Sequence, residues 1–311
     1  MAIKDLMYKD HNEWLAIRNK FIGGSDASAV LGTNPYRSTY TLWAEKTGKI
    51  PSFEGNLITE CGTYLEEFVA KQFEKATGKK VRRKNRTMVN DLYPFACANV
   101  DRLIVGEDAG LECKTTNNFL TMRQCKSGAF PDIYYAQCVH YLAVTGKKKW
   151  YLAVLLECRE FKVFELERDD AECEALMKAE AEFWNLVETN TPPSIDGTES
   201  SAESLRLIYP ESTSDVADLF AYESNLRQYV ALGKQIDELK AMREEQANII
   251  KEYMKDAGNG VTSGYKVSYS AYEKKSFDVK SFSADHPQMN LDGYYKTSSV
   301  RTFKVTEKII N

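Results

Sequence analysis

Two acidic residues and a lysine stand in a short, otherwise apolar part of this sequence. Asp101 lies near the start of one apolar run, and Glu112 and Lys114 lie in the next. Hard divalent cations are bound by such paired carboxylate oxygens, and a lysine beside the cation can hold an attacking water. Burying these charges without a purpose would be costly. The residue types therefore favour metal-assisted hydrolysis, and the alternative is a solvated strand face with a surface ion pair.

These three groups can act together only if neighbouring strands place them on one face. The two apolar runs flank a turn rich in Gly and Asp, which predicts a β-hairpin. Strand side chains alternate between faces, so Glu112 and Lys114 share one face. A four-residue loop at 106–109 would bring Asp101 to that face, opposite Lys114. A five-residue loop without a bulge would place Asp101 on the other face, and the sequence leaves both registers open.

The composition is that of a globular protein. The chain has 311 residues, of which 43% are hydrophobic and 28% charged, enough for one large or two modest domains. No apolar run approaches the length of a membrane-spanning helix. The seven cysteines contain no C-x-x-C pair, and the three histidines are far apart. We therefore expect reduced thiols in a cytoplasmic protein, with neither a disulfide framework nor a zinc site.

One basic cluster stands out against a net charge of −4. Such a cluster predicts contacts with a phosphate backbone, and the alternative is a solvated strand edge. Its members, all within 79–86, are Lys79, Lys80, Arg82, Arg83, Lys84 and Arg86.

A second candidate site lies near the N-terminus, where a Gly-Gly pair at 23–24 precedes Ser25 and Asp26. This pattern is typical of the start of a helix. Exposed backbone N–H groups at such a start bind anions. The simpler explanation is that Ser25 or Asp26 only caps the helix.

Two helices are predicted to bring polar side chains toward the hairpin. Residues 60–77 have the spacing of an amphipathic helix, with Glu66 at the edge of its apolar stripe and Glu67 nearly opposite the stripe. We therefore expect Glu66 to lean toward an interior site and Glu67 to be solvated. The helix that starts at Pro131 carries Gln137 between tyrosines, which suits a groove-facing position, although helix packing explains the tyrosines equally well.

The predicted domains are 1–190, a linker at 191–213 and a C-terminal arm at 214–311. A segment rich in Pro, Ser and Gly indicates the linker. The arm begins with a long helix or helical hairpin over 214–256. It could mediate oligomerisation or bind a partner, or it could simply complete the core. The remaining predicted elements are strands at 149–156 and 161–166, an acidic helix at 169–188, and strand-like stretches at 261–270 and 300–305.

Taken in order, these pieces resemble the YqaJ-like viral recombinases, relatives of phage lambda exonuclease in the PD-(D/E)XK nuclease superfamily. The resemblance covers about residues 11–190, and it departs from the superfamily name because no proline precedes Asp101. The residues that carry it are Arg18, Ile22 to Ala27, Gly62 and Glu66, Asn99 to Asp101, Leu111 to Lys114, and Tyr134 and Gln137.

The resemblance implies an α/β fold with a restriction-endonuclease-like core, in which helices flank a central mixed β-sheet, followed by a C-terminal helical extension and a small β element. It implies that Asp101, Glu112 and the backbone carbonyl of Cys113 hold one or two Mg²⁺ ions, with Mn²⁺ as the alternative ion. Glu66 would support the metal site, and Lys114 would orient or activate the hydrolytic water.

Four further positions match family residues with roles in binding DNA or lining the site. Arg18 and Ser25 match the positions that receive the 5′-phosphate of a DNA end. Gln137 and Tyr134 match helix positions that line the active site.

The implied activity is a metal-dependent 5′→3′ exonuclease that acts on linear double-stranded DNA and leaves 3′ single strands for phage-type recombination by single-strand annealing. The implied partners are a DNA end, a single-strand annealing protein and further copies of the chain, often in a trimeric ring, in the host cytosol and away from membranes. Alternatives are a structure-specific or restriction-type endonuclease and a non-catalytic DNA-binding module.

Overall fold

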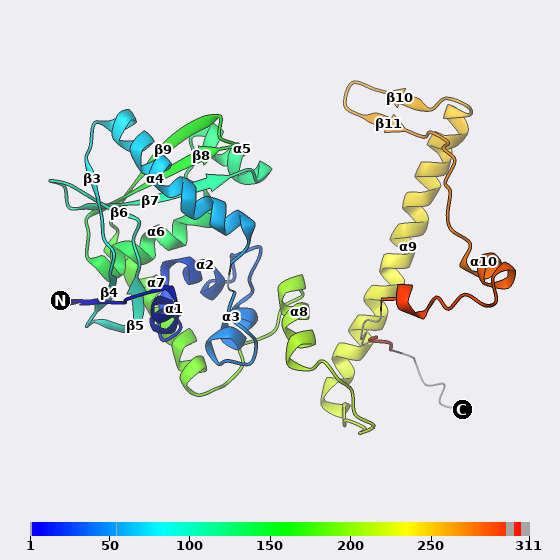
Figure 1. Cartoon of the computed structure of the whole chain (residues 1–311), viewed down its shortest axis with the longest axis horizontal. Coiled ribbons are helices and arrows are strands. Elements are labelled where there is room, and N and C mark those ends of the chain that lie inside the picture. Colours follow the sequence, from blue (N-terminus) through cyan, green and yellow to red (C-terminus); the bar gives the residue numbers. More distant parts are fainter. Residues whose placement is uncertain (1, 54, 297–301, 306–311) are drawn as a thin grey trace. The chain divides into compact units, whose positions relative to one another are not determined.

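The computed structural model describes residues 2–53, 55–296 and 302–305. The chain divides into two compact units, Met1–Pro210 and Glu211–Asn311 (Figure 1). The first unit is a mixed α/β structure in which helices cover two β-sheets. Within the described residues, no helix combines the length and the apolar character needed to cross a membrane.

A five-stranded mixed sheet forms the centre of the first unit. Its order is β3-β6-β7-β8-β9, and β7 runs parallel to β8 while the other neighbours are antiparallel. The parallel pair requires a long crossover connection, which α5 (Phe119–Ser127) and α6 (Asp132–Thr145) provide. The strands are β3 (Val81–Arg83), β6 (Arg102–Ile104), β7 (Ala109–Thr116), β8 (Lys149–Leu156) and β9 (Glu160–Glu167).

Strand β8 is buried on both faces, as its continuous apolar sequence requires. On one face Leu152 and Val154 belong to a core cluster with residues of α6 (Asp132–Thr145). On the other face Tyr151 packs with Phe73 of α4 (Leu57–Thr77). Figure 1 shows α4 and α6 on opposite sides of this sheet.

A second sheet has the order β1-β4-β5-β2. The segment that contains the basic cluster therefore joins the two sheets, because β3 lies in the first sheet and β4, which follows the cluster, lies in the second. β2 pairs in parallel with β5 and leads directly into the glycine pair at 23–24. The strands are β1 (Ile3–Leu6), β2 (Ile22–Gly23), β4 (Thr87–Asn90) and β5 (Tyr93–Ala98).

The helices begin and end at clear capping residues. Asn56 caps the start of α4 through the N–H groups of Ile58 and Thr59, and Gly78 ends it in the left-handed conformation with a φ of 73°. The apolar stripe predicted for this helix is buried only in its second half, because Cys61 is exposed and Phe68 is 46% exposed. The other helices of the unit are α1 (His11–Arg18), α2 (Ala27–Val30), α3 (Thr39–Lys46), α5 (Phe119–Ser127), α7 (Asp170–Glu188) and α8 (Glu199–Ile208).

The linker predicted at 191–213 is wrong over 199–208, where the chain forms α8 and packs against α3. The contact is a small network of hydroxyl groups. The Thr41 and Ser204 hydroxyls lie 2.8 Å apart, and the Ser201 hydroxyl donates to Ser38 Oγ at 2.8 Å. Ser201 and Ser204, which lie in the predicted linker, are therefore buried hydrogen-bonding residues.

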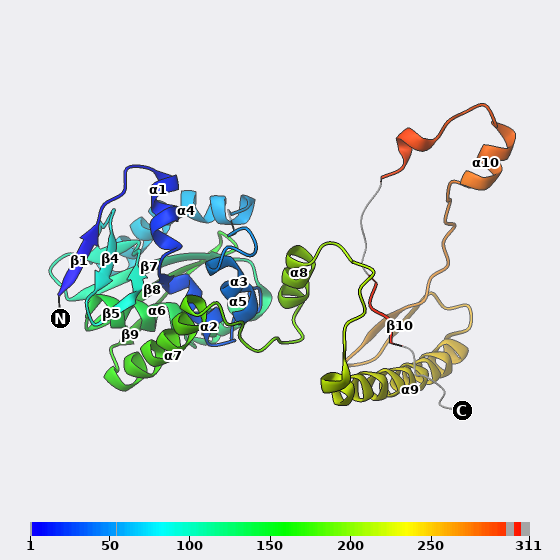
Figure 2. The same cartoon turned by 90° about the horizontal axis from the view of Figure 1, so that it is seen from below.

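The second unit is built on the long helix α9 (Glu223–Met254), which contains no buried residue (Figure 2). Apolar side chains such as Ile236, Leu239 and Met242 are at least half exposed. The strand-like stretch predicted at 261–270 is a short hairpin. The stretch at 300–305 lies partly outside the described residues, and 302–305 form no strand. The other elements are β10 (Asn259–Val261), β11 (Lys266–Ser268), α10 (Val279–Asp285) and the 3₁₀ turns Phe220–Tyr222 and Asp292–Tyr294.

We expect a fragment ending at Pro210 to fold with the thermal stability of the first unit, because every buried residue of the described chain lies at or before Ser204. A fragment ending at Ser194 lacks α8 and should lose about 2 kcal/mol of unfolding free energy, since the hydrogen bonds to Ser38 and Thr41 disappear. Urea unfolding followed by circular dichroism measures both values. Equal stabilities of the two fragments would contradict the role assigned to α8.

Candidate active site

The predicted hairpin is present, and its register differs by two residues from the one that a loop at 106–109 would give. β6 and β7 pair Arg102 with Leu111 and Leu103 with Gly110, so the loop is 105–108. Continuing this register places Asp101 opposite Glu112 and not opposite Lys114. A shift of two residues preserves the face, because strand side chains alternate with a period of two.

The cause of the shift is Gly110, which belongs to the strand and not to the turn. A Cβ atom at this position would lie 2.3 Å from the ring of Trp150 on the neighbouring strand β8. The glycine is therefore required by packing between strands. Gly106, with a φ of 79°, is the residue that turns the chain.

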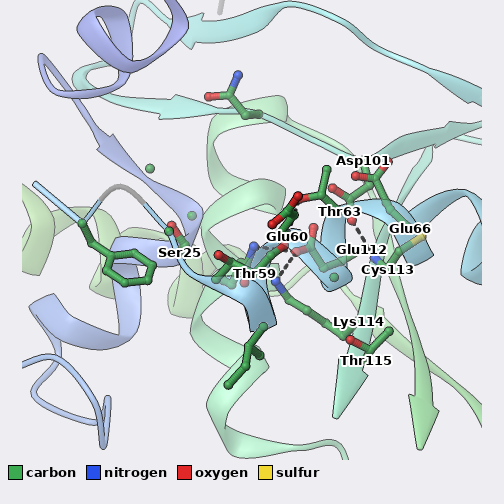
Figure 3. Close-up of a pocket in the computed structure, with 18 of the residues that line it drawn as sticks. Ser25, Thr59, Glu60, Thr63, Glu66, Asp101, Glu112, Cys113, Lys114 and Thr115 are labelled. Carbon is green, nitrogen blue, oxygen red and sulfur yellow. Dashed lines mark hydrogen bonds and ion pairs between the residues drawn. The ribbon is translucent and has the colours of Figure 1, made fainter. Parts of the chain in front are cut away.

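Asp101, Glu112 and Lys114 point into one pocket (Figure 3). The backbone N–H of Cys113 donates to Asp101 Oδ2 at 2.7 Å. Lys114 Nζ lies 2.7 Å from Glu112 Oε1, and the Gln137 side-chain amide donates to the same oxygen at 2.7 Å. Glu112 is only 3% exposed, so these two donors fix its carboxylate.

The charges of this group are strongly coupled through its burial. Burial raises the pKa of Asp101 well above its ordinary value, and the negative charges of Glu112 and Glu66 raise it further. Burial would lower the pKa of Lys114, but the carboxylates of Glu112 and Asp101 outweigh burial and raise it. Lys114 is therefore cationic, and a further positive charge near Asp101 would relieve the repulsion between the carboxylates.

The oxygen atoms at this point fit a hard divalent cation. Glu112 Oε2 is buried and has no hydrogen-bond partner among the described residues, and the Asp101 carboxylate lies beside it. A strand residue directs its carbonyl to the same side as its N–H, so the Cys113 carbonyl also faces Asp101. Carboxylate and carbonyl oxygens suit Mg²⁺ or Mn²⁺. The set has two carboxylates, and the described residues contain no group of three or more His, Cys, Asp or Glu side chains that could hold a metal.

Glu66 reaches this region but is held by an arginine. Its carboxylate pairs with Arg102, a buried residue of β6. Arg102 also pairs with Glu67 at 3.0 Å, and Arg83 pairs with Glu67 at 2.7 Å. Glu66 lines the pocket as expected. The side chain of Glu67 is 46% exposed, but it is ion-paired and not simply solvated.

The glycine pair at 23–24 leads into a second polar group at the pocket. An Arg18 guanidinium N–H donates to the Ser25 hydroxyl. Asp26 is buried, accepts from the Gly23 N–H at 3.1 Å, and pairs with Arg37 at 2.6 Å. Asp26 thus caps the turn, while Arg18 and Ser25 remain on the pocket wall. The structural role predicted for this motif is therefore seen for Asp26, and anion binding near Ser25 stays a prediction.

The tightness of this turn explains its second glycine. A Cβ atom at Gly24 would lie 2.6 Å from the ring of Tyr141 on α6. The Tyr141 hydroxyl accepts from the Gln137 amide at 2.9 Å and donates to the Asn99 carbonyl at 2.9 Å. Tyr141 therefore connects the turn, the helix and the segment before Asp101.

One cavity of about 970 Å³ contains both polar groups. Tyr134 and the basic cluster do not line it. The ring centre of Tyr134 lies 5.5 Å from Lys114 Nζ, so this tyrosine contacts Lys114 without lining the cavity. The predicted residues that line the cavity are Arg18, Ser25, Glu66, Asp101, Glu112, Cys113, Lys114 and Gln137.

The basic cluster is largely neutralised by carboxylates. Arg82 has no carboxylate partner among the described residues, and its side chain is exposed. The cluster is therefore a weaker phosphate-binding surface than its sequence indicates. The ion pairs are Lys79 with Glu107, Lys80 with Glu74, Arg83 with Glu67, and both Lys84 and Arg86 with Asp5.

Sequence reasoning missed three cations that organise the site, Arg102, Arg37 and Lys46. Arg102 directly follows Asp101, but strand alternation places neighbours on opposite faces and gave no reason to join them. The detectable signal was the number of acidic residues near the site, because three buried or half-buried carboxylates need counter-ions. Arg37 and Lys46 pair with Asp26 at 2.6 and 3.0 Å.

Comparisons with known proteins agree with this geometry. The family model of the YqaJ-like viral recombinase domain matches residues 13–148. The uncharacterized protein YqaJ of Bacillus subtilis (strain 168) is 38% identical over 302 residues, which are 95% of this chain and 94% of that protein. Protein D345L of African swine fever virus (strain Badajoz 1971 Vero-adapted) is 38% identical over 63 residues, 20% of this chain and 18% of that protein.

A solved structure shares the fold of the first unit. It is the alkaline exonuclease LHK-Exo from Laribacter hongkongensis, with a TM-score of 0.50 and 20% sequence identity. The match covers 58% of this chain and 94% of that chain. A second structure of LHK-Exo is a complex with dAMP.

We expect Asp26→Asn to destabilise the protein by about 3–5 kcal/mol at neutral pH, because it leaves buried cations without their carboxylate. Burial alone would raise the pKa of Asp26, but Lys46, Arg37 and Arg18 hold it well below its ordinary value. The contribution of Asp26 is therefore complete above the pKa of the unfolded state, about 3.9, and falls as the pH decreases toward the folded pKa.

Urea unfolding at pH 7 and at successively lower pH values measures this dependence. The control is Asp91→Asn, which removes an exposed ion pair with Lys4 at 2.9 Å and should change stability by less than about 1 kcal/mol. A difference between the wild type and Asp26→Asn that stays constant below pH 4 would show that the charge of Asp26 is not its stabilising feature.

Proposed function

Because this chain belongs to the YqaJ-like viral recombinase family, we propose that it is a metal-dependent nuclease that degrades linear double-stranded DNA from its ends. The observation that carries the proposal is the pair of the half-buried Asp101 and the buried Glu112, with Lys114 hydrogen-bonded to Glu112 inside one large cavity. Phosphodiester hydrolysis needs neutralisation of the charge on the phosphoryl oxygens and a positioned water. A metal ion held by the two carboxylates would supply the first, and Lys114 would supply the second.

Asp101, Glu112 and the Cys113 carbonyl would hold Mg²⁺ or Mn²⁺, with one ion or two. The bound ion supplies Lewis acidity and neutralises charge on the phosphoryl oxygens. Lys114 binds the attacking water, because its ammonium stands at the edge of the carboxylate pair and stays protonated. Gln137 keeps Glu112 in place by donating to Oε1, which leaves Oε2 free to accept the ion.

Arg18 and Ser25 would receive the terminal 5′-phosphate of a DNA strand. A guanidinium gives charge-assisted hydrogen bonds to phosphate oxygens, and the hydroxyl beside it is already oriented by Arg18. They share the cavity with Asp101 and Glu112, so a seated 5′ end would present its first phosphodiester toward the carboxylates. The dAMP complex of LHK-Exo supports a site that accepts a single nucleotide. This arrangement favours 5′→3′ polarity.

The wider role that we propose is the production of 3′ single strands for recombination by single-strand annealing. The chain would act beside a single-strand annealing protein and as a homo-oligomer, for which a trimeric ring is the form that we expect. The exposed apolar residues of α9 support an association of the second unit with another protein surface. Arg82 and the residual charge of the basic cluster would contribute contacts with the DNA backbone.

We expect Lys114→Ala to lower the rate of Mg²⁺-dependent degradation of linear duplex DNA by a factor of about 10²–10⁴, because the water loses its positioning group. Glu112→Gln should abolish cleavage, since it removes a carboxylate of the metal site. Release of nucleotides from an end-labelled duplex, with EDTA as the metal-free control, measures both effects. Undiminished digestion by both variants would reject the nuclease assignment. Nicking of closed circular DNA would instead favour an endonuclease.

We expect Arg18→Ala to remove a preference for 5′-phosphorylated ends. A charged hydrogen bond contributes about 1.5–3 kcal/mol, so digestion of phosphorylated ends should slow by about 10–100-fold, while 5′-hydroxyl ends are affected little. Arg82→Ala is the matched control, because this exposed arginine should slow both ends equally. If the wild type does not distinguish the two kinds of end, the proposed phosphate seat is wrong.

A further inference from the structure

We propose that Arg102 is a positioning residue that holds Glu66 away from the bound cation and thereby limits the affinity of the site for divalent metal. This inference rests on the metal-dependent function proposed above. Arg102 does not bind the ion itself. In the DNA-free protein it is the partner of Glu66 in place of the ion.

The first observation is the position of the guanidinium. Arg102 is 3% exposed and lies on β6 beneath α4. One of its nitrogens pairs with Glu66 and also donates to the Asp101 carbonyl at 2.6 Å. The other pairs with Glu67 at 3.0 Å. The planar fork thus ties the helix to the strand next to the site.

The second observation is that Glu67 does not depend on Arg102. Arg83 on the edge strand β3 already pairs with Glu67 at 2.7 Å. Within the described chain, Arg102 is the one cation that forms an ion pair with Glu66. A buried guanidinium needs a carboxylate partner, and Glu66 supplies it from the side that faces the cavity.

The third observation is the charge of the whole group. Three carboxyl groups, Asp101, Glu112 and Glu66, lie near two cations, Lys114 and Arg102. A divalent cation held by Asp101 and Glu112 would be repelled by the guanidinium of Arg102. Without Arg102 this repulsion is absent, and Glu66 loses the ion pair that holds it.

Three consequences follow for metal binding. Glu66→Gln should weaken the affinity for the ion far less than Glu112→Gln does, because Glu66 is engaged with Arg102 and is not a ligand. Arg102→Met should increase the affinity by about tenfold or more, because a nearby positive charge is removed and a carboxylate is released. The gain should be largely lost when Glu66→Gln is added to Arg102→Met, because Arg102 acts through Glu66.

The test is a titration of the full-length protein with Mn²⁺, in which electron paramagnetic resonance measures the free ion in the absence of DNA. Glu112→Gln is the reference for loss of a ligand and should reduce binding strongly. Arg83→Met is the matched control, because it removes the other arginine from Glu67 and should leave Mn²⁺ affinity unchanged. Arg102→Lys keeps the charge and should bind Mn²⁺ more weakly than Arg102→Met does.

The proposal is overturned if Glu66→Gln weakens Mn²⁺ binding as much as Glu112→Gln does, since Glu66 is then a direct ligand. It is also overturned if Arg102→Met raises the affinity equally with and without Glu66→Gln. If Arg102→Met does not fold, the comparison of Glu66→Gln with Glu112→Gln still tests the proposal. Glu66→Gln changes only a side chain that lines the cavity. Absence of Mn²⁺ binding by the wild type would instead reject the metal-dependent function itself.

Discussion

The architecture of the first unit depends on keeping two carboxylates, the half-buried Asp101 and the buried Glu112, close together. Such a pair is unfavourable unless every remaining polar atom around it is positioned to compensate. The sheet supplies the Cys113 N–H for Asp101, and α6 supplies the Gln137 amide for Glu112. Lys114 adds a positive charge from the same strand. Among the described residues, Glu112 Oε2 is buried and accepts no hydrogen bond, so its negative charge is not compensated there.

The position of α6 is fixed by contacts on its far side. His140 and Glu180 are fully buried, and His140 Nδ1 lies 2.8 Å from the Glu180 carboxylate on α7. His140 Nε2 lies 2.9 Å from the Cys97 carbonyl on β5, and because a carbonyl can only accept, this nitrogen carries the proton. His140 therefore links α6 to both β5 and α7. These contacts also hold Gln137 in position, because it lies one turn away on the same helix.

Features that depend on local periodicity could be predicted from the sequence, and features that depend on distant partners could not. The shared face of Glu112 and Lys114 follows from alternation and survives a two-residue error in register. The neutralisation of the basic cluster by Asp5, Glu74 and Glu107 was not predictable, because these carboxylates come from other strands and helices. The same limit explains α8. Its serines are typical of a loop in the sequence, and their hydrogen bonds depend on α3, which is distant in the chain.

The two walls of the cavity differ in the balance of their charged groups, so they attract different kinds of ligand. Around Asp26 the three cations Arg18, Arg37 and Lys46 face two carboxylates, Asp26 and Glu45. On the hairpin wall three carboxyl groups, Asp101, Glu112 and Glu66, face two cations, Lys114 and Arg102. An anionic group placed in the cavity is therefore attracted to the Arg18 wall, and a cation is attracted to the hairpin wall. A phosphodiester chain can bridge the two only when a cation accompanies it, so DNA binding and metal binding should reinforce each other in this site.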